Sequence, residues 1–146
     1  MEFKGLLIGG LLPALAFGAT GLLQKVTMRT GIGLGPYLLC LGLGVVIVGG
    51  ATQILSPGSL RAMSLRTAAL SGTVGASWGL GMALVALGLS RYGVPLSKLA
   101  PLYNLNTLVV VLLALAVFSE FREVAAGKLL AGTTLILLGA WLVGRA

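Results

Sequence analysis

Hydrophobic and polar positions alternate along this chain on the scale of whole segments rather than single residues. Five long apolar runs are separated by short polar stretches, and they cover about residues 5–23, 34–55, 68–89, 94–118 and 124–143. Each run is close to the length of α-helix that crosses the hydrocarbon core of a bilayer, which takes roughly 20 residues. The pattern therefore predicts five transmembrane helices.

Composition indicates the same class of protein. Of the 146 residues, 58% are hydrophobic and 9% are charged, and the mean hydropathy is +1.08. Too little polar surface remains to cover a water-soluble globule. In lipid every backbone polar group must be bonded within a helix or a closed barrel, and runs of this length favour helices. We expect an all-α integral membrane protein, a single domain over residues 1–146 that forms a five-helix bundle in the plasma (inner) membrane.

The basic residues bear on orientation in the membrane. Ten Lys and Arg against three Asp and Glu give a net charge of +7, but they stand singly near the ends of the runs. That spacing argues against a nucleic-acid-binding face and fits anchoring at anionic headgroups. Five crossings divide them equally, with Lys4, Arg61, Arg66, Arg122 and Lys128 on one side and Lys25, Arg29, Arg91, Lys98 and Arg145 on the other. Because Lys and Arg counts set orientation, this balance is compatible with insertion in both directions.

Several kinds of chemistry lack the residues they need. Cys40 is the only cysteine and histidine is absent, so neither an intrachain disulfide nor a Cys/His metal site can form. The three acids, Glu2, Glu120 and Glu123, lie at run ends, which leaves no membrane-embedded carboxylate for coupling to protons or cations. No nucleophile, base and orienting group converge in the sequence. We expect no metal, no cofactor and no enzymatic activity.

Small residues recur every four positions in the third run. They are Ser71, Gly75, Gly79 and Ala83. In lipid such a stripe lets two helices approach closely, so the simplest interpretation is helix packing, with direct ligand contact as the alternative.

The fourth run contains a lysine between two prolines. Lys98 lies about one turn into this helix, and Pro95 and Pro101 flank it. One interpretation is that its long side chain reaches back to the interface; the other is that it faces an anion in a cavity. The prolines remove backbone donors and free carbonyls one turn earlier, as in the unwound helices that line transporter cavities.

Polar side chains follow Pro101 near the centre of the same run. Tyr103, Asn106 and Thr107 share one helical face, and Asn104 lies beside them. They can bond to other helices or to a substrate, and the spacing favours neither. Three further candidates are Trp78 at mid-depth of the third run and Gln24 with Lys25 at the end of the first. Trp78 is either core filler or a cavity wall.

Three short patterns follow one another in a fixed order along the chain. Residues 17–25 hold small and aromatic residues followed by a lysine; residues 99–102 read Leu-Ala-Pro-Leu before an apolar run that ends in Phe-Ser-Glu at 118–120; and residues 127–139 hold spaced glycines among apolar residues. In this order the chain resembles one half of a drug/metabolite transporter, the five-helix repeat of EamA type. The resemblance covers essentially the whole chain, and each pattern alone is common in apolar proteins.

The resemblance implies a particular assembly. Most members of that superfamily fuse two such repeats into ten helices, with the halves inverted because each crosses the membrane an odd number of times. This chain supplies one repeat, and a unit with balanced charge can rebuild the inverted pair by dimerising in antiparallel fashion. The four-helix multidrug exporters of the superfamily resemble each other in a glutamate within the first helix. The first run here has none, so export of cationic drugs is not expected.

These observations together predict an antiparallel homodimer that moves a small metabolite by alternating access. Two lysines and no buried acid favour an anionic or zwitterionic substrate. We expect a cavity lined by Trp78, Lys98, Tyr103, Asn104 and Asn106, with Gln24 and Lys25 near its mouth. Two alternatives remain open: a flippase for a lipid-linked sugar or a phosphate-bearing lipid, and a non-transporting partner subunit of a larger membrane complex.

Overall fold

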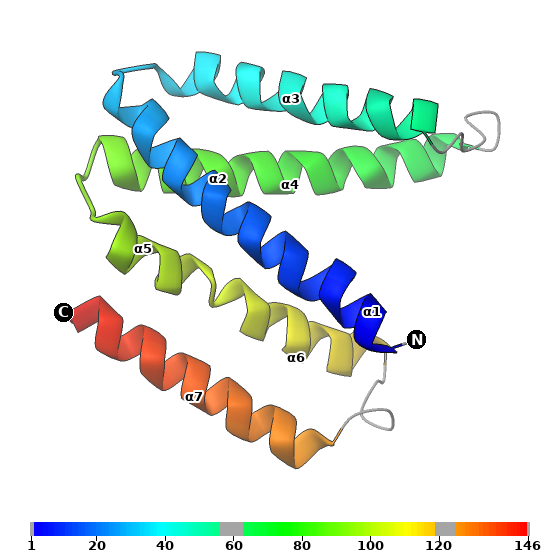
Figure 1. Cartoon of the computed structure of the whole chain (residues 1–146), viewed down its shortest axis with the longest axis vertical. Helices are drawn as coiled ribbons and strands as arrows, with labels where there is room; N and C mark the ends of the chain where they lie inside the picture. Colours follow the sequence, from blue (N-terminus) through cyan, green and yellow to red (C-terminus); the bar gives the residue numbers. More distant parts are fainter. Residues whose placement is uncertain (1, 56–62, 119–124, 146) are drawn as a thin grey trace. The chain divides into compact units, whose positions relative to one another are not determined.

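The structure, a computed structural model, describes residues 2–55, 63–118 and 125–145. These residues form helices joined by short links (Figure 1). In chain order the elements are α1 (Glu2–Leu6), a π-helical turn η1 (Leu7–Leu11), α2 (Leu12–Arg29), α3 (Leu34–Leu55), α4 (Leu65–Ser90), α5 (Leu96–Tyr103), α6 (Asn106–Phe118) and α7 (Ala126–Arg145).

Within the described ranges, five helical stretches are long and apolar enough to cross a membrane. They are Phe3–Arg29, Leu34–Leu55, Leu65–Ser90, Leu96–Val117 and Gly127–Arg145. The expected class, an all-α multi-pass membrane protein, is confirmed at this level. Arg61, Arg122, Glu120 and Glu123, which entered the charge analysis, lie outside the described residues.

The first helix is longer than hydropathy predicts. It was expected to end near Leu23, but α2 continues through a polar segment to Arg29. The Thr27 hydroxyl donates to the Leu23 carbonyl at 2.9 Å, and the Thr30 hydroxyl donates to the Thr27 carbonyl at 2.7 Å. Because these side chains bond to their own helix, polar residues can extend the helix towards the membrane surface. The link to α3 is therefore only residues 30–33, where Gly31 takes a φ of +78° that suits glycine.

A π-helical turn replaces regular α-helix just before Pro13. The Leu12 N–H donates to the Leu7 carbonyl, five residues back. Pro13 has no N–H, and in a regular α-helix its ring would crowd the carbonyl of Gly9. The wider turn is a known response to such a mismatch within an α-helix. The first span thus changes its helical geometry between α1 and α2.

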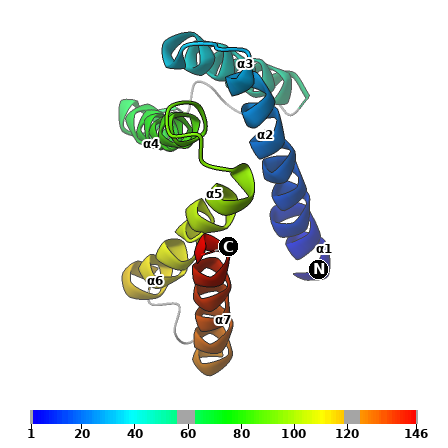
Figure 2. The same cartoon turned by 90° about the vertical axis from the view of Figure 1, so that its left-hand side faces the viewer.

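The described contacts divide the chain into two compact units, residues 1–93 and residues 94–146, and each is described by itself. In the first unit, α4 packs against both α2 and α3 (Figures 1 and 2). The centre of this packing is formed by Met28, Tyr37 and Ala86, one residue from each of the three helices. Partly buried aliphatic side chains surround them, namely Ile32, Leu34, Leu38, Leu41 and Leu89. The single five-helix bundle stays a prediction.

In the second unit, α5 packs against the carboxyl-terminal part of α7. Gly144 lies so near α5 that a Cβ added there would sit 3.8 Å from Cδ2 of Leu102. The two helices run in opposite directions, so the first turn of α5 and the last turn of α7 lie at the same end of the unit (Figure 1).

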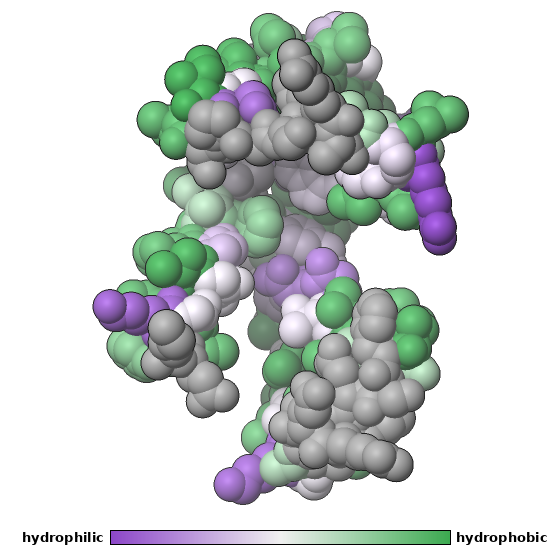
Figure 3. Space-filling view, turned by 90° about the vertical axis from the view of Figure 1, so that its right-hand side faces the viewer, coloured by the Kyte–Doolittle hydropathy of each residue, from purple (hydrophilic) through white to green (hydrophobic). Residues whose placement is uncertain are grey.

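Most of the apolar surface of both units is uncovered. In the most apolar part of each span, at most 6% of residues are buried. Figure 3 shows mainly hydrophobic described residues on one face, interrupted by small hydrophilic patches. An apolar surface of this extent needs lipid or protein around it.

The buried Ala86 provides a test of the packing in the first unit. Its exposed fraction is 0%, and α2, α3 and α4 meet around it. Ala86→Leu should overpack this contact and lower the free energy of unfolding by about 1–3 kcal/mol. Titration of the protein in mixed micelles with a denaturing detergent measures this change.

The matched control is Ala76→Leu, which adds the same atoms to an exposed position of the same helix. This variant should unfold within about 0.5 kcal/mol of wild type. Equal losses for both variants would contradict the described packing.

Candidate functional site

The fourth span is interrupted near its middle. Helix α5 ends at Tyr103 and α6 begins at Asn106. Asn104, between them, lies about 12 Å along the helix axis from Leu96 at 1.5 Å per residue. The Asn104 N–H still donates to the Ala100 carbonyl, four residues back, at 3.1 Å. The Leu105 and Thr107 N–H groups instead donate three residues back, to Leu102 at 3.2 Å and Asn104 at 3.1 Å. The backbone therefore tightens at residues 104–105 and continues as a second helix.

The two prolines of this span have different places in it. Pro95 is the residue that precedes the first turn of α5, where its missing N–H costs nothing. Pro101 lies inside α5, so the carbonyl of Ser97 loses the donor that a regular helix would supply there. The interruption follows three residues after Pro101, at Asn104, whose short amide side chain competes with helical backbone bonds.

Several hydroxyl groups in the described helices and at their ends are bonded to their own helix. Seven donate to a carbonyl three or four residues back, at 2.7–2.9 Å: those of Thr20, Thr27, Thr30, Thr52, Thr73, Ser90 and Thr134. These side chains need no further partner in lipid.

The asparagines at the interruption are different. The side-chain Oδ1 of Asn106 accepts a long hydrogen bond of 3.4 Å from the Thr107 hydroxyl. The side-chain amide of Asn104 has no hydrogen bond within the described residues. Both asparagines are exposed, and Tyr103 beside them is half-buried. The interruption therefore offers amide donors and acceptors at mid-span, and it is the strongest candidate site in the described residues.

Gln24 has a structural partner. Its side chain is 3% exposed, and Nε2 donates to the Met82 carbonyl at 2.9 Å, which ties α2 to α4. The sequence marked Gln24 as a possible ligand-binding amide, but nothing in it pointed to a backbone carbonyl 58 residues away. Lys25, the next residue, is partly covered.

The third span carries Trp78 and the small-residue stripe. Trp78 is 40% exposed, so it is neither fully packed nor free. Along the stripe, Ser71 and Gly75 are exposed, whereas Gly79 and Ala83 are partly buried near the contacts of Met82 and Ala86. A Cβ at Gly75 or Gly79 would meet nothing within 4 Å, so neither glycine is required by a close contact in the described chain.

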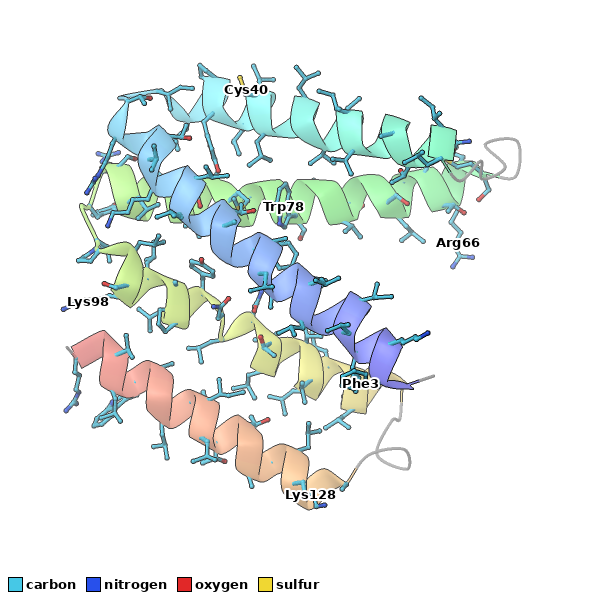
Figure 4. The ribbon with its side chains drawn as sticks, in the orientation of Figure 1. Phe3, Cys40, Arg66, Trp78, Lys98 and Lys128 are labelled. Carbon is cyan, nitrogen blue, oxygen red and sulfur yellow. The ribbon has the colours of Figure 1, made fainter. Side chains whose placement is uncertain are left out.

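Lys98 lies in the first turn of α5, where its backbone N–H donates to the Pro95 carbonyl at 3.0 Å. Its side chain extends outward from the helix on the side where α7 ends (Figure 4). At the end of α7, the Arg145 guanidinium carbon lies 4.0 Å from the centre of the Trp141 ring. Lys98 therefore lies at an end of the span, apart from the asparagines near its middle.

Comparison of this chain with protein-family models, with curated protein sequences and with solved structures found no match. The arrangement of its own residues therefore carries the functional argument.

The buried amide of Gln24 gives a test of the α2–α4 contact. Gln24→Met keeps the length of the side chain but removes the donor to the Met82 carbonyl. Hydrogen bonds between membrane helices contribute about 0.5–1.5 kcal/mol, and the free energy of unfolding in mixed micelles should fall by that amount.

Thr27→Val serves as the control on the same helix, since the Thr27 hydroxyl bonds only to its own backbone. It should change the free energy of unfolding by less than about 0.5 kcal/mol. If Gln24→Met were as stable as wild type, the bond would have no stabilising role.

Proposed function

We propose that this protein is a membrane transporter of the drug/metabolite type that works as an antiparallel homodimer. The observation that carries this proposal is the interruption at residues 104–105, where two exposed amides lie in the middle of an apolar span. Polar groups and irregular backbone at membrane depth are stable only against protein or a water-filled cavity. Interrupted helices at mid-depth are a recurrent way to build a transport site.

The side chains at the interruption suit a small polar substrate. Each amide of Asn104 and Asn106 can donate and accept hydrogen bonds, and the Tyr103 hydroxyl can do both. The anionic or zwitterionic character that we propose for the substrate depends on lysine charge. Lys25 and Lys98 are both partly covered and both lie near the end of a span, so either can supply that charge.

The arrangement of charge supports an antiparallel pair. In the first unit, Lys4 and Arg66 begin spans at one end, while Lys25, Arg29 and Arg91 close spans at the other. In the second unit, Lys128 lies at one end and Lys98 with Arg145 at the other. Each end of each unit therefore carries basic residues, which weakens the usual bias of orientation.

Orientation should respond to single charges. Because the Lys and Arg balance is even, Lys128→Gln and Arg91→Gln remove a charge from opposite sides and should shift the orientation in opposite directions. A reporter fused to the C-terminus and read in both compartments measures the shift. Wild type should give signal on both sides. A single orientation that neither substitution changes would contradict the antiparallel pair and favour the partner-subunit alternative.

Uptake should depend on the amides of the fourth span. Asn104→Leu and Asn106→Leu should each lower uptake at least about ten-fold, since a bound polar group would lose a partner and leave others unpaired. Proteoliposomes supplied in turn with labelled amino acids, organic acids and organic cations provide the assay. We expect uptake of members of the first two groups.

The control is Thr134→Val in α7, whose hydroxyl bonds to its own helix, and it should transport like wild type. Dimer content is measured in parallel, so that loss of assembly is separated from loss of binding. Unchanged uptake in both asparagine variants would contradict the proposed site. Movement of labelled lipid without uptake of solutes would favour the flippase alternative.

A further inference from the structure

One end of the second unit carries two cations and an aromatic ring, Lys98 on α5 and Arg145 with Trp141 on α7. Lys98 lies one turn before Leu102 on α5, and Leu102 lies against Gly144, the neighbour of Arg145 on α7. Residues four apart share a helical face, so Lys98 begins on the face of α5 that meets α7. Because α5 and α7 pack together in opposite directions, Lys98 and Arg145 lie at the same end of this helix pair.

The Arg145 guanidinium is held against an aromatic face. It lies 4.0 Å from the centre of the Trp141 ring, one turn earlier on α7. Stacking uses the flat face of a guanidinium and leaves its N–H donors, which point outward in the plane, free to bind an anion. Within the described residues neither Lys98 nor Arg145 has an ion-pair partner. The two side chains thus present unpaired donors in a partly fixed arrangement.

The surroundings are those of a membrane interface. The pair lies where the fourth span begins and the fifth span ends, and tryptophan is enriched at that depth. Towards the membrane interior the neighbouring surface is apolar, with Leu102 42% exposed, Leu138 53% exposed and Leu142 61% exposed. A ligand here meets cations at one end and uncovered hydrocarbon at the other.

We propose that Lys98, Arg145 and Trp141 form a binding site for the phosphate diester of an anionic phospholipid. The phosphate oxygens accept from the lysine ammonium and the guanidinium edge, and the acyl chains lie along Leu138 and Leu142. This geometry matches basic sites between membrane helices that select anionic headgroups. The exposed aliphatic surface beside the cations favours a lipid over a free phosphate ion. The site lies wholly within the second unit and does not depend on the proposed transport.

The chain offers a direct spectroscopic test. It has two tryptophans, so Trp78→Phe leaves Trp141 as the only one. This variant is placed in lipid nanodiscs of phosphatidylcholine with increasing fractions of phosphatidylglycerol, and bromine atoms on the acyl chains of one lipid at a time quench Trp141. We expect brominated phosphatidylglycerol to quench at a much lower mole fraction than brominated phosphatidylcholine.

Removal of charge should abolish this preference. Each cation near a membrane surface contributes about a five-fold preference for anionic lipid, so Lys98→Gln or Arg145→Gln should reduce it about five-fold and the double variant about 25-fold. Lys128→Gln removes a lysine from the other end of α7 and should leave the preference unchanged. Lys98→Arg keeps the charge and should bind nearly as wild type, which guards against a misfolded Lys98→Gln variant.

Three results would overturn the proposal. The first is equal quenching by the two brominated lipids in the Trp78→Phe protein. The second is a loss in Lys128→Gln as large as in Lys98→Gln, which would show a response to net charge alone. The third is an equal change of Trp141 emission with inorganic phosphate in pure phosphatidylcholine, which would show an ion site without lipid selectivity.

Discussion

The need to bond every backbone polar group in apolar surroundings governs this structure. Regular helices meet that need within each span, and several threonine and serine hydroxyls are bonded to the same helices. In the described residues, polar side chains therefore form few bonds between helices, and the bond from Gln24 to the Met82 carbonyl is the clearest. The constraint also makes exceptions informative. Where the fourth span changes from four-residue to three-residue bonds, exposed amides accompany the change, and this coincidence distinguishes the segment from the other spans.

The positions of the spans could be predicted from hydropathy, while the ends of the first span could not. The second helix runs over Leu34–Leu55 as expected, because apolar residues fill it from end to end. The first runs on to Arg29, since its last turns are built from polar residues that hydropathy assigns to a loop. The contact at Ala86 was also not foreseeable, because an alanine in an apolar run carries no sign of the two helices that meet around it.

The candidate site was predictable in its residue types and only partly in its geometry. Pro101 predicts a disturbed helix, because it removes the N–H that would bond to the Ser97 carbonyl. The helix is interrupted three residues later, at Asn104, whose side chain competes with helical backbone bonds. Gln24, expected near a substrate, bonds to a neighbouring helix. Lys98 was left between two interpretations, and both stay open, because its side chain is partly covered and lies near a span end. The small-residue stripe from Ser71 to Ala83 identified one face of the third span but not the helix that packs on it. Only Gly79 and Ala83, its second half, are partly buried.

The π-helical turn changes how the first span should be compared with related helices. A bond across five residues accommodates one more residue than a bond across four, which is about 100° of rotation at 3.6 residues per turn. Phe3 and Lys4 are thus out of phase with α2. If one residue were deleted between Leu7 and Leu11, the span could form a continuous α-helix. The N-terminal segment would then be rotated about the helix axis relative to α2, with no substitution in α2. Length variation at this point therefore acts as a rotation of the helix tip.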